Sequence, residues 1–195
     1  VIADADRTNE VLRAKAGLYT ETCLLVVRAD SAIQTLDVLS GHTVSIGAEE
    51  SGTERNATQI LEFAGMPSSL VTTKNLDYIE ATKELKAGDI DAFFCTAGLT
   101  TTVIDELSKE CDIRLIPLTD TVISKMLESS SAYTSEVIPA GTYTGQTTDI
   151  STIGVKSVLI TKSDVSDDTI EQLTSLLFEK ENELSYSNSL KLELT

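Results

Sequence analysis

The chain has 195 residues, of which 41% are hydrophobic, and a formal net charge of -16 at pH 7. A chain of this length and hydrophobicity buries the core of one good-sized domain or two small ones, which excludes an intrinsically disordered protein. The strong negative charge excludes a nucleic-acid-binding protein, because no basic stripe is present to neutralise phosphates, and it disfavours contact with an anionic membrane surface.

The N-terminal part of the chain predicts two helices and two strands. Residues 1–17 are typical of the end of a helix, with apolar residues at helical spacing and Gly17 as its stop. Residues 18–29 predict a strand, 31–41 a short helix, and 44–47 a second strand. Strands and helices therefore alternate from the start of the chain.

The middle of the chain continues this alternation. Helical periodicity is clearest over residues 53–64. The apolar residues of that helix fall on one face: Ala57, Ile60, Leu61 and Ala64. A weak strand is predicted over 70–73, and a helix over 77–87 that ends at Gly88. The apolar run over 90–95 predicts a strongly buried strand.

The C-terminal part predicts helices over 99–109 and 119–128, strands over 113–118 and 151–161, and a last helix with Ser166 as its N-cap. The last helix is expected to bury four apolar residues: Ile170, Leu173, Leu177 and Leu184. Because strands and helices alternate along the chain, the sequence predicts an α/β fold with a mostly parallel sheet.

The segment 44–101 twice carries a strand into a turn of small residues and then into a helix. A helix N-terminus presents free backbone N–H groups and about half a positive charge, so two such turns side by side would receive a carboxylate. The ligand-binding residues expected on this basis are Ser51, Gly52, Thr53, Ala97, Gly98 and Thr100. The same residue types also favour an ordinary N-cap, and the pattern alone leaves both interpretations open.

Two tyrosines and one arginine are further candidates for contact with a ligand. Tyr19 and Tyr143 could close over it, although either ring could equally be half-buried packing. Arg28 could pair with a ligand carboxylate, but a structural pair with Asp30 at the end of its own strand is favoured. A site of this kind depends more on backbone dipoles than on charged side chains.

The residues with catalytic potential give little support for an enzyme. His42 is the single histidine and is expected at the surface, and Arg55 and Asn56 are expected on a solvated helix face. Cys95 stands at the end of a strand before a helix, where a nucleophile elbow places its thiol, but no G-x-S-x-G surrounds it. We expect no enzyme, and a reaction centred on Cys95 remains an alternative.

Several classes of site are not expected. The three cysteines, Cys23, Cys95 and Cys111, have no metal-binding or redox spacing, and no phosphate-binding loop is present. No apolar run approaches the roughly 20 residues of a membrane-spanning helix. We therefore expect no metal, no cofactor and no direct membrane insertion.

Four groups of residues follow one another at a characteristic spacing. They are Val26-Val27-Arg28-Ala29-Asp30-Ser31; Ile46-Gly47 with Ser51-Gly52-Thr53-Glu54; Leu85-Lys86-Ala87-Gly88-Asp89-Ile90-Asp91-Ala92-Phe93-Phe94; and Ile138-Pro139-Ala140-Gly141-Thr142-Tyr143 with Gly145-Gln146. In these groups the chain resembles the TAXI family of TRAP-transporter solute receptors. Two features depart from that family: Glu50 stands where a glycine is usual, and residues 97–101 replace a turn that contains glycine and proline.

The resemblance implies the fold of type II periplasmic binding proteins, with two α/β lobes joined by hinge strands and the first lobe incomplete at its N-terminal side. Residues 1–39 and 116–195 would form the remainder of lobe I, and 40–115 a complete lobe II. Hinges would lie at 30–39 and 116–120.

The resemblance also implies a function. The chain would be a periplasmic or extracytoplasmic receptor that binds a small organic anion or amino acid, such as glutamate or a dicarboxylate, between its lobes. Its partners would be that solute and the membrane components of a TRAP transporter, and not nucleic acid. The effector-binding domain of a cytoplasmic regulator, which has the same fold, remains an alternative to this receptor.

Overall fold

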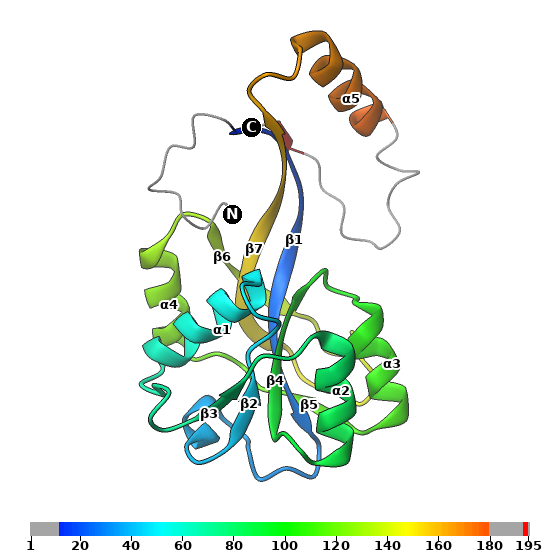
Figure 1. Cartoon of the computed structure of the whole chain (residues 1–195). Coiled ribbons are helices and arrows are strands. Elements are labelled where there is room, and N and C mark those ends of the chain that lie inside the picture. Colours follow the sequence, from blue (N-terminus) through cyan, green and yellow to red (C-terminus); the bar gives the residue numbers. More distant parts are fainter. Residues whose placement is uncertain (1–11, 180–192, 195) are drawn as a thin grey trace.

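The computed structural model in Figure 1 describes residues 12–179 and 193–194. Its strands form one sheet in the order β3-β2-β4-β1-β7-β6, and β5 and β8 also pair with β1. The strands are β1 (Leu12–Arg28), β2 (Thr43–Ser45), β3 (Thr72–Lys74), β4 (Ala92–Ala97), β5 (Ile113–Leu115), β6 (Tyr133–Ile138), β7 (Ile150–Lys162) and β8 (Glu193–Leu194).

The helices begin and end at residues suited to these positions. They are the 3₁₀ helix η1 (Leu36–Leu39) and the α-helices α1 (Gly52–Phe63), α2 (Tyr78–Ala87), α3 (Thr102–Glu110), α4 (Asp120–Ser129) and α5 (Asp167–Glu179). Ser51 caps α1 by accepting from the Glu54 backbone N–H at 3.1 Å. Asp77 and Glu80 form a capping box at the start of α2, which ends at a left-handed Gly88 as predicted.

Each face of the sheet has its own hydrophobic core. Leu25, Val27 and Phe94 point to the face covered by α1 and α4, where they pack with buried side chains of both helices. Their neighbours Leu24 and Phe93 point to the opposite face, where α2 and α3 pack. This alternation follows from the two-residue period of a strand, and it produces three layers with the sheet in the middle (Figure 1).

The expected helix over 1–17 is wrong for the residues that the structure describes. Residues 12–17 form the first part of β1, which is antiparallel to β7 from Leu12 to Thr22. Helical spacing of a few apolar residues is a weak signal, and pairing with a distant strand overrides it. Residues 1–11 of the predicted helix lie outside the described residues.

The sheet is mixed, which corrects the expectation of a mostly parallel one. Among the described strands, the only parallel pairs are β2 with β3 and β2 with β4. β1 is antiparallel to β4, β5, β7 and β8, and β6 is antiparallel to β7. The crossover helices α1 and α2 fix the parallel part, whereas β1 and β7 run through the sheet in opposite directions.

Two smaller expectations also change. The helix predicted over 31–41 contracts to η1, and α5 buries none of its apolar side chains. Leu173 in α5 keeps 41% of its surface exposed, because α5 lies beyond the end of β7, away from the body of the molecule (Figure 1). Leu184, the fourth residue expected to be buried by the last helix, lies outside the described residues.

β1 and β7 form a two-stranded ribbon that extends from the body toward α5 (Figure 1). The register of their pairing shifts between Ala14 and Ala16 and between Gly17 and Tyr19, and such irregularities bend a strand pair. None of the helices within residues 12–179 is long and apolar enough to cross a bilayer.

The predicted lobe boundaries at residues 40 and 116 stay a prediction. Ile116 and Met126, which were expected in lobe I, share one core with Val44 and Ala57 of lobe II. The predicted hinges at 30–39 and 116–120 also contribute buried side chains to this core, so motion there would disrupt it. Residues on both sides of the predicted boundaries thus pack in one core.

Candidate functional site

A pocket of about 500 Å³ lies between the start of α1 and the β1–β7 ribbon. Its wall combines residues 50–56 around the α1 N-terminus with Tyr78 from α2 and Thr96 from β4. Glu21 of β1 and several residues of β7 between 155 and 160 line the opposite side. The volume falls in the range of small-molecule sites.

The turn before α1 leaves backbone donors unpaired at this pocket. Gly47 adopts a φ of +99°, and a Cβ there would lie 2.7 Å from the Thr53 Cβ, so the chain needs glycine to turn toward the helix. Among the described residues, none accepts from the backbone N–H of Gly52 or Thr53. These two N–H groups can therefore donate to an anion in the pocket.

The Tyr78 hydroxyl connects α1, α2 and β4 beneath the pocket. It lies 2.7 Å from the Thr53 hydroxyl, donates to the Thr96 carbonyl at 2.9 Å and accepts from the Thr96 N–H at 3.2 Å. Burial, followed by the proximity of Cys95, raises the pKa of Tyr78 to about 12. The phenol is therefore neutral at physiological pH and acts as a hydrogen-bonding junction.

Asn56 is buried, which corrects the expectation of a solvated face. Only 4% of its surface is exposed. Its side-chain amide donates to the Thr96 hydroxyl at 3.3 Å and accepts from the Tyr133 hydroxyl at 3.0 Å. Its neighbour Arg55 is exposed, as predicted, and lines the pocket. At the start of α1 the buried polar side chain of Asn56 thus lies next in sequence to the exposed cation of Arg55.

The charged side chains of the pocket have both signs. Arg55 and Lys156 contribute positive charge, and Glu21 and Glu50 negative charge. Glu21 accepts from the Tyr19 hydroxyl at 3.2 Å, and burial raises the pKa of its carboxyl group. A ligand that carries both a carboxylate and a cationic group would be complementary to such a lining.

Glu50 has the conformation of a glycine. Its φ of 60° is the only positive value for a non-glycine residue in the described part of the chain. Glycine adopts this backbone conformation without strain, whereas an L side chain adopts it only at a cost. The Glu50 side chain is exposed, and the Glu50 backbone N–H donates to the Glu54 carboxylate at 2.6 Å.

The predicted site residues separate into groups. Ser51, Gly52 and Thr53 lie together in the pocket. Gly98 lies beside Tyr19, since a Cβ on Gly98 would be 4.0 Å from the Tyr19 ring. Ala97 accepts from the Thr22 hydroxyl at 3.3 Å through its carbonyl, and Thr100 is exposed on the same turn. The turn 97–100 and Tyr19 lie outside the pocket lining, so a ligand contact there stays a prediction.

Tyr143 lies in a loop that is held together internally. Only 3% of the surface of Tyr143 is exposed, and its hydroxyl donates to the Leu99 carbonyl. In the same loop the Gln146 amide donates to three carbonyl groups, those of Ile138, Pro139 and Thr148, at 3.0–3.2 Å. Tyr143 therefore supports the turn after β4 and does not line the pocket.

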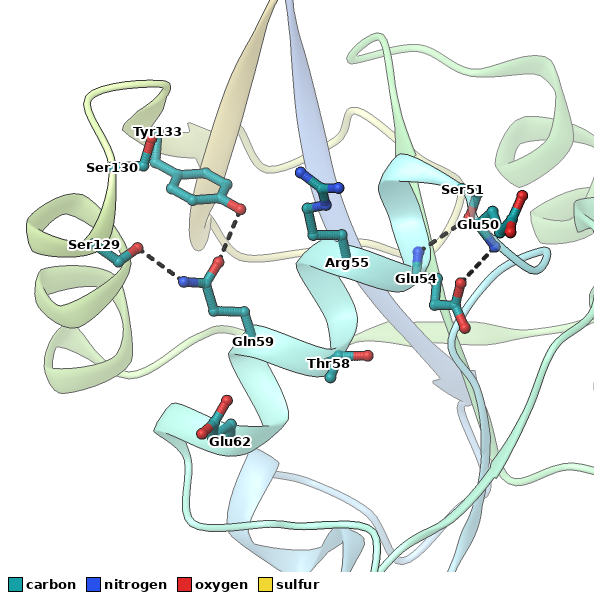
Figure 2. Close-up of a pocket in the computed structure, with 10 residues that line it drawn as sticks. All are labelled: Glu50, Ser51, Glu54, Arg55, Thr58, Gln59, Glu62, Ser129, Ser130 and Tyr133. Atoms are coloured by element: carbon teal, nitrogen blue, oxygen red, sulfur yellow. Dashed lines mark hydrogen bonds between the residues drawn. The ribbon is translucent and has the colours of Figure 1, made fainter. Parts of the chain in front are cut away.

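A second groove, of about 720 Å³, lies between α1 and α4 (Figure 2). Gln59 spans it: its side-chain amide donates to the Ser129 hydroxyl at 3.0 Å, and its side-chain carbonyl, 3.0 Å from the Tyr133 hydroxyl, shares the single proton of that hydroxyl with Asn56. Arg55 and Ser51 line both the groove and the pocket. Because the central side chains of the groove already bond one another, we consider it a weaker candidate for a ligand site.

Cys95 does not have the environment of a nucleophile. It is fully buried, and burial raises its pKa to about 12, so its thiolate is nearly absent at neutral pH. Cys23 is also buried, with a pKa raised to about 11 for the same reason. The described residues include no cluster of three metal-ligating side chains. The hypothesis of an enzyme that uses Cys95 is therefore not supported by the geometry.

Thiol labelling tests this burial directly. At pH 8 in native buffer we expect 5,5′-dithiobis(2-nitrobenzoate) to react quickly with Cys111 alone, because Cys111 is partly exposed whereas Cys23 and Cys95 are buried. In denaturant all three cysteines of the chain should react. Cys111→Ser should remove the fast phase. Fast labelling of Cys95 in that variant would show that the thiol is accessible and ionised.

The mixed α/β fold is that of the type II periplasmic binding proteins. The chain belongs to the NMT1-like family, whose model matches residues 2–194. Among solved structures, it resembles a mutant of ArgBP from T. maritima, with a TM-score of 0.50, 18% identity and coverage of 91% of this chain and 59% of that one.

A second structural relative is Tv2483, which was solved with L-arginine bound. The TM-score is 0.50 and the identity 17%, over 88% of this chain and 54% of that one. The chain thus spans a little over half the length of either relative.

Proposed function

We propose that the chain is the ligand-binding part of a periplasmic or extracytoplasmic solute receptor of the TAXI type, which serves a TRAP transporter. It binds a small organic anion or an amino acid, such as glutamate or a dicarboxylate, in a cleft between two lobes. The observation that carries this proposal is the pocket at the α1 N-terminus, where the N–H groups of Gly52 and Thr53 have no described acceptor.

A ligand carboxylate at this position has several donors. The two backbone N–H groups point from the positive end of α1, and the Ser51 hydroxyl can donate because its oxygen accepts from Glu54. The exposed Arg55 adds a cation at the pocket rim. Charge-assisted hydrogen bonds of this kind contribute about 1.5–3 kcal/mol each, so two or three of them supply about 3–9 kcal/mol of the roughly 8 kcal/mol that micromolar binding requires.

Closure of a second lobe over the pocket completes the proposed mechanism. The β1–β7 ribbon forms one wall of the pocket, and the register shifts of that ribbon suit a hinge. The ligand would stabilise the closed state by contacting both lobes. The membrane components of the transporter would then recognise the closed form.

Gly52→Pro is the sharpest test of this site. Gly52 is the first residue of α1, where proline is well tolerated, and the substitution deletes only the N–H group that we expect to bind the carboxylate. We expect affinity for the ligand to fall about tenfold, equal to about 1.4 kcal/mol, while the melting temperature of the free protein stays within a few degrees.

Ligands are found first by thermal shift on the full-length protein, with L-glutamate, L-arginine, glutarate and succinate as probes. At a hundredfold excess over the dissociation constant, a ligand stabilises the native state by about 2.7 kcal/mol. Gly52→Ala is the matched control, because it keeps the N–H group and its Cβ meets no atom within 4 Å. Equal affinity of the proline and alanine variants would remove the α1 N-terminus from the site, and no shift with any probe would contradict a receptor for these solutes.

A further inference from the structure

We propose that Tyr78 determines which ligands the pocket accepts, by fixing the Thr53 hydroxyl as a hydrogen-bond acceptor that, together with Glu21, selects an α-amino acid over a dicarboxylate. The inference rests on the proposed function and specifies its ligand class. It follows from the directions of the hydrogen bonds beneath the pocket and from the charge that faces them.

The proton of the Tyr78 hydroxyl is already committed. The Thr96 carbonyl, 2.9 Å away, has no proton to give and can only accept, so Tyr78 donates to it. The Thr96 N–H donates in turn to the Tyr78 oxygen at 3.2 Å. Because a phenol has one proton, Tyr78 has nothing left to donate to a third partner.

The Thr53 hydroxyl must therefore donate to Tyr78. The two oxygens are 2.7 Å apart, and only Thr53 can supply the proton between them. Thr53 is 5% exposed and lines the pocket. Because its proton is used for Tyr78, its hydroxyl oxygen can only accept from a ligand that reaches it. The Thr53 hydroxyl oxygen is therefore complementary to a hydrogen-bond donor of the ligand, and it would repel a carboxylate oxygen at the same position.

This direction gives the hydroxyl of Thr53 a role different from that of its backbone N–H. The backbone N–H of Thr53 still faces an anion, because no described residue accepts from it. The hydroxyl has the opposite polarity. One residue thus offers a donor and an acceptor, which matches the adjacent carboxylate and ammonium groups of an α-amino acid.

Glu21 adds the charge that an ammonium group needs. It lines the same pocket from β1, across from the α1 N-terminus. Its position is defined by the hydrogen bond from Tyr19 at 3.2 Å. Burial raises the pKa of Glu21, so its carboxylate gains more from a cationic partner than a fully hydrated one would. The pocket is therefore polarised, with donors at α1 and acceptors at Thr53 and Glu21.

The test compares ligand pairs that differ only by the ammonium group, such as L-glutamate with glutarate and L-arginine with 5-guanidinovalerate. Calorimetric titration of the full-length protein gives the ratio of the two dissociation constants. We expect the amino acid of a pair to bind at least thirtyfold more tightly. Glu21→Gln should reduce this ratio about tenfold without moving the melting temperature of the free protein by more than a few degrees.

Tyr78→Phe tests the positioning role. In the variant the Thr53 hydroxyl no longer donates to Tyr78 and loses its fixed orientation as an acceptor, so the amino acid should bind less tightly and the ratio should fall about tenfold. Thr53→Val, which removes the acceptor at nearly constant volume, should lower the ratio in the same way and serves if Tyr78→Phe does not fold. Tyr133→Phe is the matched control. The hydroxyl that it removes bonds Asn56 and Gln59 and not Thr53, so the variant should leave the ratio unchanged.

The outcomes separate the two proposals. Equal binding of the paired ligands by the wild-type protein would overturn the role of Tyr78, and so would a ratio that neither Tyr78→Phe nor Thr53→Val changes. In both cases the receptor function would stand, because binding itself is observed. If no member of any pair binds, the receptor proposal fails and the inference fails with it.

Discussion

Gly47→Ala is expected to lower the free energy of unfolding by about 3 kcal/mol and to abolish the response to ligand, because it combines a left-handed backbone with a steric clash. The φ of Gly47 is +99°, which L side chains rarely adopt. Its new Cβ would lie 2.7 Å from the Thr53 Cβ and 3.0 Å from the Ser51 hydroxyl oxygen. Thr53 and Ser51 are the start of α1, so the clash moves the proposed ligand donors.

Urea unfolding and thermal shift with the ligands found above measure both effects. Gly52→Ala is again the control. Gly52 is not among the glycines with a positive φ, and no atom lies within 4 Å of the position that its Cβ would take. We expect that control to change the stability by less than 1 kcal/mol. A Gly47→Ala variant as stable as the control would show that the turn before α1 adapts without strain.

Phe94→Ala is expected to lower the free energy of unfolding by about 4 kcal/mol. Phe94 is 1% exposed and packs in the core between the sheet and the helices α1 and α4. Truncation removes the transfer free energy of the ring and leaves a cavity that a close-packed core fills only in part. Equilibrium unfolding in urea, with the midpoint and the slope both fitted, checks this value.

Val137→Ala provides the control for that measurement. Val137 is also an apolar strand residue, but 52% of its surface is exposed on β6. Its truncation should change the stability by about 0.5 kcal/mol or less. Similar losses for the two variants would mean that the described core does not dominate the stability of the chain.

Much of the fold between residues 44 and 129 could be predicted from the sequence because its signals are local. The start of α1 follows from Ser51 as a cap, and α2 ends at Gly88 as predicted. The apolar run before Cys95 is a buried strand, displaced by two residues from the predicted bounds. In these elements, periodicity, capping residues and tertiary packing favour the same structure.

The parts that could not be predicted depend on partners far away in the chain. Residues 12–17 become a strand only because β7 pairs with them, and the polar sequence of β6 gives little sign of a strand. Tyr78, Thr96 and Asn56 carry no motif, and only the sheet topology brings them together beneath the pocket. Asn56 in particular has the residue type of a solvated position, although two hydrogen bonds compensate its burial.

The central place of β1 also affects the order in which the chain acquires its structure. β1 is synthesised before β4, β5 and β7, the strands with which it pairs. The hydrogen bond between the Cys23 carbonyl and the Thr152 hydroxyl joins residues 129 positions apart. Such a high contact order slows folding, because the entropy of closing a long loop is lost before the contacts form. On the ribosome, β1 stays without its main partner until β7 has emerged, which makes this strand the part of the nascent chain with the greatest need for a chaperone.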